Sequence, residues 1–470
     1  MSQINKLKIL NDPIYGFISI TNPLIYDLIQ HTYFQRLRRI SQMGMSYLVY
    51  PGAHHTRFHH ALGCMHIMQK TIGVLRFKGI EISEEEENAL SIAILLHDIG
   101  HGPFSHAMER SIVENVHHES ISILFMDSLN AEFEGRLTLA IKIFKGEYHR
   151  KFMLQLISSQ LDMDRMDYLK RDSFYSGVAE GNINSERLIQ MFNVENDMLV
   201  IEEKGIYSVE KFLVARRLMY WQAYLHKTSV AAELVLTKIL KRAKELTHTG
   251  VYLPASEPLR YFLMNKVGLE EFNNEVLTKF SYLDDFDIMS AIKAWQFNDD
   301  FVLSELSKMI INRDLPKIKL RAEKFGKDDA TNLRNYMMEL YSITEKEADY
   351  FVFKGKIKNQ AYNKTGEPIH ILMKDRSIED VVAASDQLNL KALSKPVTKY
   401  YLCFPKVLLE KAKFMIFSNK AFDNFDLTNY FCETPTSDVV IIIFNLLIAL
   451  PGITTAKGHP DINRVKGKQH

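Results

Sequence analysis

The sequence predicts a mainly α-helical protein with a small α+β region near its C-terminal end. Apolar residues recur at helical spacing through most of the first two thirds of the chain, and few stretches alternate as strands do. Later, short β-like runs appear between turn-rich segments such as NKTGEP. The composition, 46% hydrophobic and 24% charged over 470 residues, is that of a folded chain with a substantial core.

Two short helices are expected in the first part of the chain, over about residues 23–43. Apolar side chains recur there every three or four positions. Three arginines are interleaved with the apolar pattern and are expected to form a solvated face: Arg36, Arg38 and Arg39.

Two longer helices are expected next, over about residues 58–77 and 84–101. Ser83, followed three residues later by Glu86, is a capping-box start for the second of them. The residue before a proline is driven out of the α region, so the glycine-proline pair that follows is expected to end this helix near His101.

Further helical patterns follow, over about residues 118–130, 136–144, 150–172, 185–193, 208–245 and 257–266. Residues 194–207 interrupt them with short alternating runs around an acidic turn, which predicts a small hairpin. From Asp285 the helical pattern is expected to continue to about Arg334.

The C-terminal region is expected to contain strands at Tyr350–Phe353, Ile369–Met373 and Lys399–Phe404, with a helical stretch near Ile378–Leu388. The apolar run Val439–Leu450 is well short of the roughly 20 residues that span a bilayer as a helix, so we expect a buried strand or helix there.

The charge balance and the cysteines restrict the function class. The 58 basic and 57 acidic residues nearly cancel, so we expect no membrane association and no strong nucleic-acid binding. Cys64, Cys403 and Cys432 lie far apart without a metal-binding spacing, which fits a reducing cytoplasm. The first twenty residues lack the apolar stretch of a secretory signal, so a cytoplasmic protein is expected.

Histidines and carboxylates concentrate in three segments. Five of the 17 histidines fall in the 13 residues from His54 to His66. The second segment, HDIGHGPFSH, begins at His97 after an apolar helix. The third, LDMDRMDYLKRD, places polar groups on one helical face: Asp164, Asp167 or Tyr168, and Arg171 or Asp172.

These segments predict a site for a divalent metal ion. A carboxylate such as Asp98, at the end of an apolar helix, is costly to bury unpaired, and a cation removes that cost. The alternative is that the His-Asp pair is an ordinary satisfied surface pair. Imidazoles with carboxylates form a mixed donor set that suits manganese, iron, nickel or zinc. The expected ligands, which leave coordination positions open, are His60, His97, Asp98 and Asp164. Other nearby histidines are expected to be structural: His54, His55, His59 and His66.

The blocks FQRLRRISQMG, YPGAHHTRFHHALG, LLHDIGHGPFSHAMER and LDMDRMDYLKRDSFYSGV together resemble the HD-domain metal-dependent phosphohydrolases, in their deoxynucleoside triphosphate triphosphohydrolase branch. The resemblance is close over about residues 9–230 and looser to about residue 406. With it we expect an HD-domain helical core in residues 1–240, a helical extension in 241–335 and an α+β C-terminal region in 336–470. The tail from Cys432 fits no recognisable module.

The resemblance gives the four metal positions to the same ligands already expected. It also implies active-site histidines at His101, His106 and His118. Of these, His106 or His118 would protonate the departing 5′ oxygen of a nucleotide.

The resemblance further implies how the phosphates are held. Arg57, three residues before His60 and on the same helical face, would clamp the α-phosphate. Arg165 stands where a lysine is common and would hold the outer phosphates. Arg216 matches a phosphate-contacting position.

For the sugar, the resemblance implies four contacts. Tyr168 would leave little room for a 2′-hydroxyl group, while Asp172 and Gln42 would bind the 3′-hydroxyl group. Tyr224 matches a position that stacks on the sugar. The alternative for Tyr168 and Tyr224 is that they are aromatic residues at the edge of the core.

The expected activity is therefore the metal-dependent hydrolysis of a deoxynucleoside triphosphate to deoxynucleoside and triphosphate. The ion would be Mn, Fe, Ni, Zn or Mg, and the protein would form a homo-oligomer, a dimer or tetramer. Gln30 departs from the family's guanine-reading aspartate, so the resemblance does not extend to activation by a guanine nucleotide. The alternatives are hydrolysis of another nucleotide or phosphoester, or a catalytically weak nucleotide-sensing scaffold.

Overall fold

A computed structural model describes residues 8–20, 22–104, 106–109, 111–113, 116–364, 366–386 and 393–409, with residues 106 and 109 by their backbone only. All of these residues belong to one compact unit. The apolar run Val439–Leu450 and the tail from Cys432 lie outside the described residues. The division of the chain into core, helical extension and α+β region stays a prediction.

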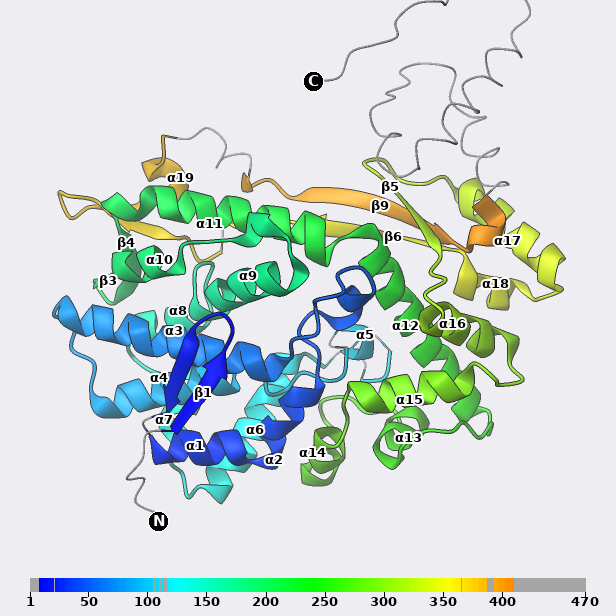
Figure 1. Ribbon diagram of the computed structural model, residues 1–470, viewed down its shortest axis with the longest axis horizontal. Helices are drawn as coiled ribbons and strands as arrows, with labels where there is room; N and C mark the ends of the chain where they lie inside the picture. Colours follow the sequence, from blue (N-terminus) through cyan, green and yellow to red (C-terminus); the bar gives the residue numbers. More distant parts are fainter. Residues whose placement is uncertain are drawn as a thin grey trace, which may run out of the picture. The chain divides into compact units, whose positions relative to one another are not determined.

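The protein is mainly helical, as expected, and its first half is a series of packed helices (Figure 1). They are α1 (Pro23–Gln30), α2 (Thr32–Gln35), α3 (Arg57–Phe77), α4 (Glu84–Leu96), α5 (His106–Glu109), α6 (His118–Glu132), α7 (Thr138–Phe144), α8 (Lys151–Ile157), α9 (Met163–Ser176) and α10 (Ser185–Met191). Helix α3 packs against α4 on one side and α9 on the other, so the three helices bring distant parts of the sequence together.

The second half of the chain continues the helical pattern. Its helices are α11 (Ile206–Met219), α12 (Lys227–His248), α13 (Glu257–Met264), α14 (Asn274–Ser281), α15 (Asp285–Trp295), α16 (Phe301–Ile311), α17 (Lys327–Tyr341), α18 (Glu345–Phe351) and α19 (Val381–Ala384). A π-helical turn, Tyr220–Tyr224, separates α11 from α12.

Three small sheets accompany the helices. Strands β1 (Lys8–Asp12) and β2 (Gly16–Ile20) form an antiparallel hairpin. A second sheet has the order β3-β4-β7-β8, formed by Phe192–Glu195, Met198–Glu202, His370–Leu372 and Ile378–Asp380. In a third sheet, β9 (Val397–Phe404) lies between β5 (Lys317–Arg321) and β6 (Phe353–Asn359). The hairpin expected over residues 194–207 is confirmed as β3 and β4.

Helix α4 begins as expected and ends earlier than expected. Ser83 Oγ accepts from the Glu86 amide at 3.1 Å, and the Glu86 carboxylate accepts from the Ser83 amide at 2.8 Å, which completes the capping box. The helix ends at Leu96, five residues before His101. Ser122 Oγ donates to the His97 carbonyl at 2.8 Å and accepts from the Gly100 amide at 2.9 Å, so tertiary hydrogen bonds replace those of a further helical turn.

Two long helices expected from periodicity are each divided in two. The pattern over 150–172 is α8 and α9, because Asp162 caps α9 by accepting a hydrogen bond from the Arg165 amide at 2.7 Å. The pattern over 208–245 is α11 and α12, and His226 caps α12 by accepting from the Thr228 amide at 3.3 Å.

Three expectations for the C-terminal region are wrong. Tyr350 and Phe351 end helix α18, which the capping box of Thr344 and Glu347 initiates, so β6 starts only at Phe353. Residues Ile378–Asp380 are strand β8, which pairs with β7, and only the short helix α19 follows. The helical run expected from Asp285 to Arg334 is interrupted by β5, which pairs with β9 far along the chain.

Arg36 is also placed differently from the solvated face expected for it. It begins a 3₁₀ turn, Arg36–Arg39, and its side chain is fully buried. Nη2 donates to the Ile99 carbonyl and Nη1 to the Leu283 carbonyl, and the guanidinium lies over the rings of Phe125 and Phe280. Carbonyl oxygens and aromatic faces therefore stabilise the buried charge, while Arg36 Nε makes no hydrogen bond within the described residues.

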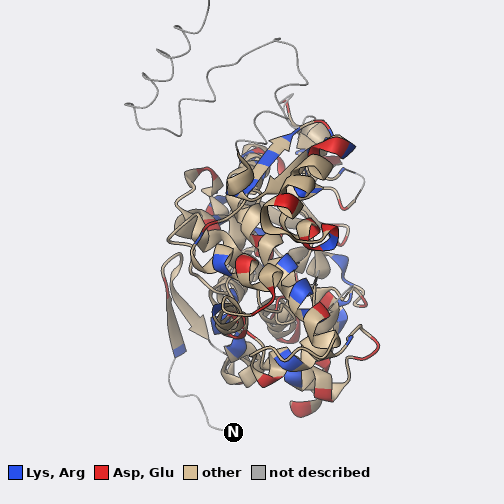
Figure 2. Ribbon diagram, turned by 90° about the vertical axis from the view of Figure 1, so that its right-hand side faces the viewer, with Lys and Arg blue, Asp and Glu red and all other residues tan. Residues whose placement is uncertain are grey.

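The surface charge is mixed. Figure 2 shows basic and acidic residues interspersed over the helices, as the near-equal totals in the sequence lead one to expect. Within the described ranges, every helix is too short or too polar to cross a lipid bilayer.

Candidate metal and nucleotide site

Helix α3 positions one set of candidate side chains. Its N-terminus is fixed by Thr56, whose backbone amide donates to Nδ1 of His59 at 3.2 Å, so this histidine has the structural role expected for it. Arg57, His60 and Cys64 then follow on the face that packs against α4 and α9, and all three are buried. The expected helix thus delivers its polar side chains into the interior.

The turn after α4 and the first turns of α9 deliver the other candidates to the same place. His97 and Asp98 directly follow α4, and Asp164 lies in the first turn of α9. His60 Nε2 lies 3.0 Å from Asp164 Oδ1 and 3.8 Å from Asp98 Oδ2. His97 Nε2 lies 3.4 Å from Asp98 Oδ1 and 3.6 Å from Asp164 Oδ1. The structure therefore brings together all four side chains expected to bind a metal.

Each of the two imidazoles is held by its other nitrogen. His60 Nδ1 lies 2.7 Å from Asp167 Oδ2, and His97 Nδ1 lies 2.6 Å from the carbonyl oxygen of Ile94. With an ion bound, a proton on each Nδ1 would keep these two hydrogen bonds and leave both Nε2 lone pairs for the ion. This is the arrangement that orients histidine ligands in metalloproteins.

Asp167 is held in turn by a buried chain of ion pairs. Arg171 Nε donates to Asp167 Oδ2 at 2.8 Å, and Arg171 Nη1 donates to Asp12 at 2.8 Å. Burial would raise the pKa of Asp167, but the Arg171 charge and the His60 hydrogen bond lower it to about 2. Asp167 therefore stays ionised and keeps the His60 ring in one orientation.

The two carboxylates that face the imidazoles are also ionised. Burial by itself would raise the pKa of Asp98, but the neighbouring imidazoles and the Arg57 guanidinium hold it well below its usual range. Burial likewise opposes ionisation of Asp164, and the neighbouring imidazoles of His60 and His97 lower its pKa below the usual range. Ionised carboxylates and imidazole lone pairs are the donors that a divalent cation needs.

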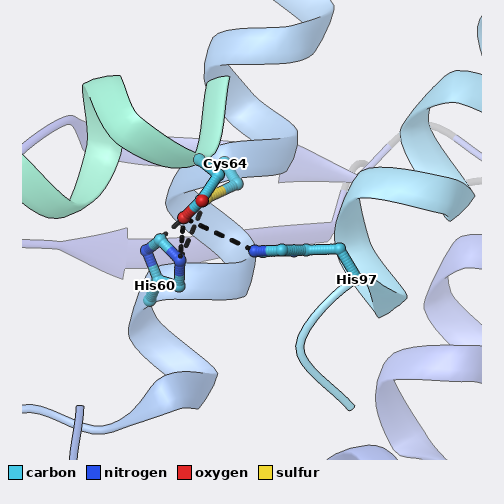
Figure 3. Close-up of side chains that lie close together, drawn as sticks. His60, Cys64 and His97 are labelled. Carbon is cyan, nitrogen blue, oxygen red and sulfur yellow. Dashed lines mark hydrogen bonds and ion pairs between the residues drawn. The ribbon is translucent and has the colours of Figure 1, made fainter. Parts of the chain in front are cut away.

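The residues present fit such an ion. His97 Nε2 is buried, yet it makes no hydrogen bond within the described part of the chain. A buried polar nitrogen without a partner is costly, and a cation between it and the two carboxylates removes that cost. Figure 3 shows His60 and His97 pointing toward one another, with Cys64 beside His60.

Two of the three expected active-site histidines lie next to this cluster. His101 Nε2 is 3.3 Å from Asp98 Oδ1, and the rings of His101 and His118 stack with centroids 3.7 Å apart. Burial and the Arg57 charge hold the pKa of His101 well below its usual range, so this imidazole is neutral. The side chain of His106 lies outside the described residues.

Two of the three arginines expected to bind phosphate form ion pairs with acidic residues. Arg57 forms an ion pair with Asp98, and Arg165 forms one with Asp162. Arg216, on α11, acts electrostatically on Tyr168, and two of its nitrogens, Nε and Nη1, are buried without a hydrogen-bond partner among the described residues. A guanidinium with two unsatisfied buried nitrogens is suited to an anionic ligand.

The residues expected to bind the sugar form a second polar cluster around Asp172. His55 Nε2 lies 2.6 Å from Asp172 Oδ1, and the Tyr224 hydroxyl donates to Asp172 Oδ2 at 2.7 Å. The rings of Tyr168 and Tyr224 meet edge to face at 6.0 Å. Gln42 donates its backbone amide to the His55 carbonyl at 3.0 Å, and its side-chain Oε1 is buried without a partner among the described residues.

Sequence reasoning missed two contacts of the metal site. Cys64 Sγ lies 3.5 and 3.6 Å from the two ring nitrogens of His60. Its position one helical turn after His60 is the sequence pattern from which this contact could have been predicted. Asp12 reaches Arg171 from a hairpin that periodicity did not predict, so no local signal indicated that contact.

Comparison with known proteins agrees with this geometry. The HD domain family matches residues 57–172, and the HD associated region family matches residues 183–252. The uncharacterized protein YwfO of Bacillus subtilis is 32% identical over 424 residues, which are 87% of this chain and 94% of that protein. The deoxynucleoside triphosphate triphosphohydrolase SAMHD1 homolog of Dictyostelium discoideum is 30% identical over 257 residues, 51% of this chain and 50% of that protein.

Among solved structures, a phosphohydrolase from Bacteroides thetaiotaomicron is 51% identical, with a TM-score of 0.83, over 85% of this chain and all of that chain. The HD domain match begins at Arg57 and ends at Asp172, so it contains the four expected metal ligands. Together with the similarity to YwfO along most of its length, this shows that the chain belongs to the HD-domain phosphohydrolase family, whose catalytic domain is metal-dependent.

Proposed function

We propose that the protein hydrolyses deoxynucleoside triphosphates at the α-phosphorus and releases deoxynucleoside and inorganic triphosphate. The observation that carries the proposal is a row of side chains on one face of α9, Asp164, Tyr168 and Asp172, at four-residue intervals. At 1.5 Å per residue the row is about 12 Å long. One end of the row lies in the cluster of expected metal ligands, and the other end lies in the polar cluster around Asp172. This order matches that of the phosphates and then the sugar in a nucleotide.

The similarity to proteins named for this activity supports the proposal. The Dictyostelium discoideum relative carries the name deoxynucleoside triphosphate triphosphohydrolase, and its similarity extends over half of this chain. Because a shared fold does not by itself fix the substrate, the argument for the nucleotide rests on the side chains of α9 and their neighbours.

In the proposed reaction a water oxygen bonds to the α-phosphorus, the bond from phosphorus to the 5′ oxygen breaks, and a proton ends on that oxygen. A divalent ion on His60, His97, Asp98 and Asp164 supplies Lewis-acid stabilisation of the charge on the phosphate oxygens. His118 or His106 donates the proton to the departing oxygen, and His101 holds the His118 ring by stacking on it.

The arginines would change partners when substrate and ion bind. Arg57 pairs with Asp98, the carboxylate that the ion would take, so ion binding leaves the Arg57 guanidinium for the α-phosphate. Arg165 and Arg216, which both act electrostatically on Tyr168, would hold the outer phosphates.

Tyr168 would set the preference for deoxyribose. In the proposal its ring occupies the space of a 2′-hydroxyl group, while Asp172 and Gln42 bind the 3′-hydroxyl group. The His55 and Tyr224 hydrogen bonds fix the Asp172 carboxylate in place for this contact.

The direct test incubates the purified protein with each deoxynucleoside triphosphate and Mn²⁺ or Mg²⁺. Chromatography should detect inorganic triphosphate as a product, and an Asp98→Asn variant should form none. Release of pyrophosphate or monophosphate instead, or hydrolysis only of other phosphoesters, would refute the proposal. Binding of nucleotide without turnover under every metal would favour a nucleotide-sensing scaffold.

The sugar preference has its own test. A Tyr168→Ala variant should gain activity toward ribonucleoside triphosphates, because the space for a 2′-hydroxyl group opens. A Tyr168→Phe variant keeps the ring and is the matched control, so it should retain the preference for deoxyribose. Equal ribonucleotide use by wild type and Tyr168→Ala would contradict the assignment.

We also propose that the protein acts in the cytoplasm as a dimer or tetramer, as the resemblance implies. Sedimentation velocity of the full chain tests the oligomer, and a monomer at micromolar concentration would contradict it. Metal analysis of protein purified without chelator identifies the ion among Mn, Fe, Ni, Zn and Mg.

A further inference from the structure

The cation-binding space has a sulfur donor as well as nitrogen and oxygen donors. The donor atoms of His60, Cys64, His97 and Asp164 all lie within 4.8 Å of one another. Cys64 is fully buried on α3, four residues after His60, a spacing that places two ligands of one metal on the same helical face. Figure 3 shows the Cys64 side chain beside the His60 ring, on the side that His97 faces.

Two distances within this group match those between ligands of one tetrahedral ion, and a third is shorter. Bonds of 2.0–2.3 Å to nitrogen, oxygen and sulfur place neighbouring ligand atoms about 3.3–3.8 Å apart. His60 Nε2 is 3.6 Å from Cys64 Sγ and 3.0 Å from Asp164 Oδ1, and His97 Nε2 is 3.6 Å from Asp164 Oδ1. Sγ is also 3.5 Å from His60 Nδ1, so coordination requires the thiol to turn toward Nε2 about its single side-chain torsion.

Asp98 and Cys64 are alternatives for the fourth position. Asp98 forms an ion pair with Arg57 and lies 3.3 Å from His101, so it has partners besides the ion. Among the residues described, the Cys64 thiol makes its hydrogen-bonding contacts with the His60 ring.

A second sign that a ligand belongs here is His97 Nε2, which lies 3.4 Å from Asp98 and 3.6 Å from Asp164. Nε2 is buried, makes no hydrogen bond within the described ranges and belongs to the same group of donor atoms as Cys64 Sγ. A hard ion such as Mn²⁺ prefers the carboxylate of Asp98, whereas a thiophilic ion prefers sulfur.

We propose that Cys64 is a metal-selectivity residue: it supplies a thiolate ligand to a thiophilic divalent ion, Zn²⁺ or Co²⁺, held with His60, His97 and Asp164. In this form Asp98 keeps its ion pair with Arg57. Four protein ligands fill a tetrahedral shell, and such closed shells are typical of structural sites rather than catalytic ones. Sulfur coordination thus gives the site a second, closed form. The inference shares the cation site of the proposed function and is independent of which nucleotide is hydrolysed.

The test uses the full chain, stripped of metal and titrated with Co²⁺ in the absence of nucleotide. The wild-type complex should show a sulfur-to-cobalt charge-transfer band in the near ultraviolet. The band should disappear in Cys64→Ser and persist in Cys403→Ser, which changes the other described buried cysteine, in β9. A wild-type complex without the band, or a band that survives in Cys64→Ser, overturns the proposal.

Calorimetric titrations with Zn²⁺ and Mn²⁺ provide the second readout. Cys64→Ser should bind Zn²⁺ about tenfold or more weakly than wild type. Its affinity for Mn²⁺ should change by less than about twofold, because that ion takes oxygen ligands. Equal losses for both ions would mean a structural role and overturn the proposal. If Cys64→Ser does not fold, Cys64→Ala gives the same comparison. Because nucleotide is absent, a failed hydrolysis assay leaves this result unaffected.

Discussion

Arg36 Nη2 donates a hydrogen bond to the carbonyl oxygen of Ile99 at 2.7 Å, inside the turn that carries the candidate metal ligands. The same guanidinium donates to Leu283 at 3.3 Å, next to α15. The turn therefore depends on a buried charge from a segment outside the matched HD domain. Burial lowers the pKa of Arg36 to about 9, and it remains charged at neutral pH.

Replacing Arg36 with Met should weaken metal binding as well as the fold. The two carbonyl oxygens lose their donors, so unfolding should require roughly 2–5 kcal/mol less than in wild type. Loosening of the 97–101 turn should lower Mn²⁺ affinity about tenfold, measured by calorimetry on folded protein. Arg38→Met, at an exposed position of the same turn, is the control and should bind Mn²⁺ as wild type does. Equal Mn²⁺ affinity in both variants would show that Arg36 does not hold the turn.

Asp285 should make the stability of the protein depend on pH. Its carboxylate accepts hydrogen bonds from the amides of Ser41 and Phe104 at 2.8 and 2.9 Å. Burial nevertheless raises its pKa from 3.8 to about 6, and Asp284 adds to the rise. The Asp285 carboxyl group also interacts electrostatically with Arg36 and Tyr47.

Because the folded pKa lies above the unfolded one, the stabilisation from protonated Asp285 is present below about pH 4 and lost as the pH rises through 6. The loss amounts to roughly 3 kcal/mol. Urea unfolding at several pH values should show wild type losing this advantage over Asp285→Asn between pH 4 and 7. A constant difference between the two proteins across that range would contradict the assignment.

Two glycines of α3 should respond oppositely to alanine. A Cβ atom at Gly63 would lie 2.0 Å from Asp167 Oδ1 and 2.3 Å from Arg171 Nη2, so Gly63→Ala should break the ion pair behind His60. The expected cost is roughly 1–3 kcal/mol or more. At Gly73 a Cβ atom meets nothing within 4 Å, and Gly73→Ala should stabilise the helix by about 0.5–1 kcal/mol. Chemical denaturation of both variants checks the pair, and similar shifts in one direction would disprove the packing argument.

Removal of divalent ions should lower the melting temperature of the wild-type protein. An ion that binds only the folded state at about a hundredfold excess over its dissociation constant stabilises by about 3 kcal/mol. His97→Gln lacks one donor, so chelator should change its melting temperature little. Differential scanning calorimetry with and without chelator measures both, and a chelator-insensitive wild type would contradict a tightly held ion.

Much of the site could be predicted because its residues follow short-range rules. Asp164, Tyr168 and Asp172 share one face of α9, so periodicity alone groups them. The convergence of α3, α4 and α9 was expected from the chemistry of the donor set and from the family resemblance. The structure agrees with that expectation in its distances.

The parts that could not be predicted depend on contacts between distant residues. Strand β5 pairs with β9, and its sequence KIKLR alternates polar and apolar residues as a strand does, but over only five residues between helices. Arg36 was expected to face solvent, but its side chain is buried against the rings of Phe125 and Phe280. The early end of α4 depends on Ser122, a residue of the next long helix.

The ion pair between Asp12 and Arg171 limits where the chain can be truncated. The HD domain match begins at Arg57, yet Arg171 inside it is fully buried and shares its charge with a carboxylate from the β1–β2 hairpin. A fragment that contains only the matched residues would lack Asp12. The buried Arg171 guanidinium would then keep only the Asp167 carboxylate as an ion-pair partner. A fragment that keeps the candidate metal ligand His60 in this arrangement therefore includes the hairpin, which lies well before the first residue of the HD domain match.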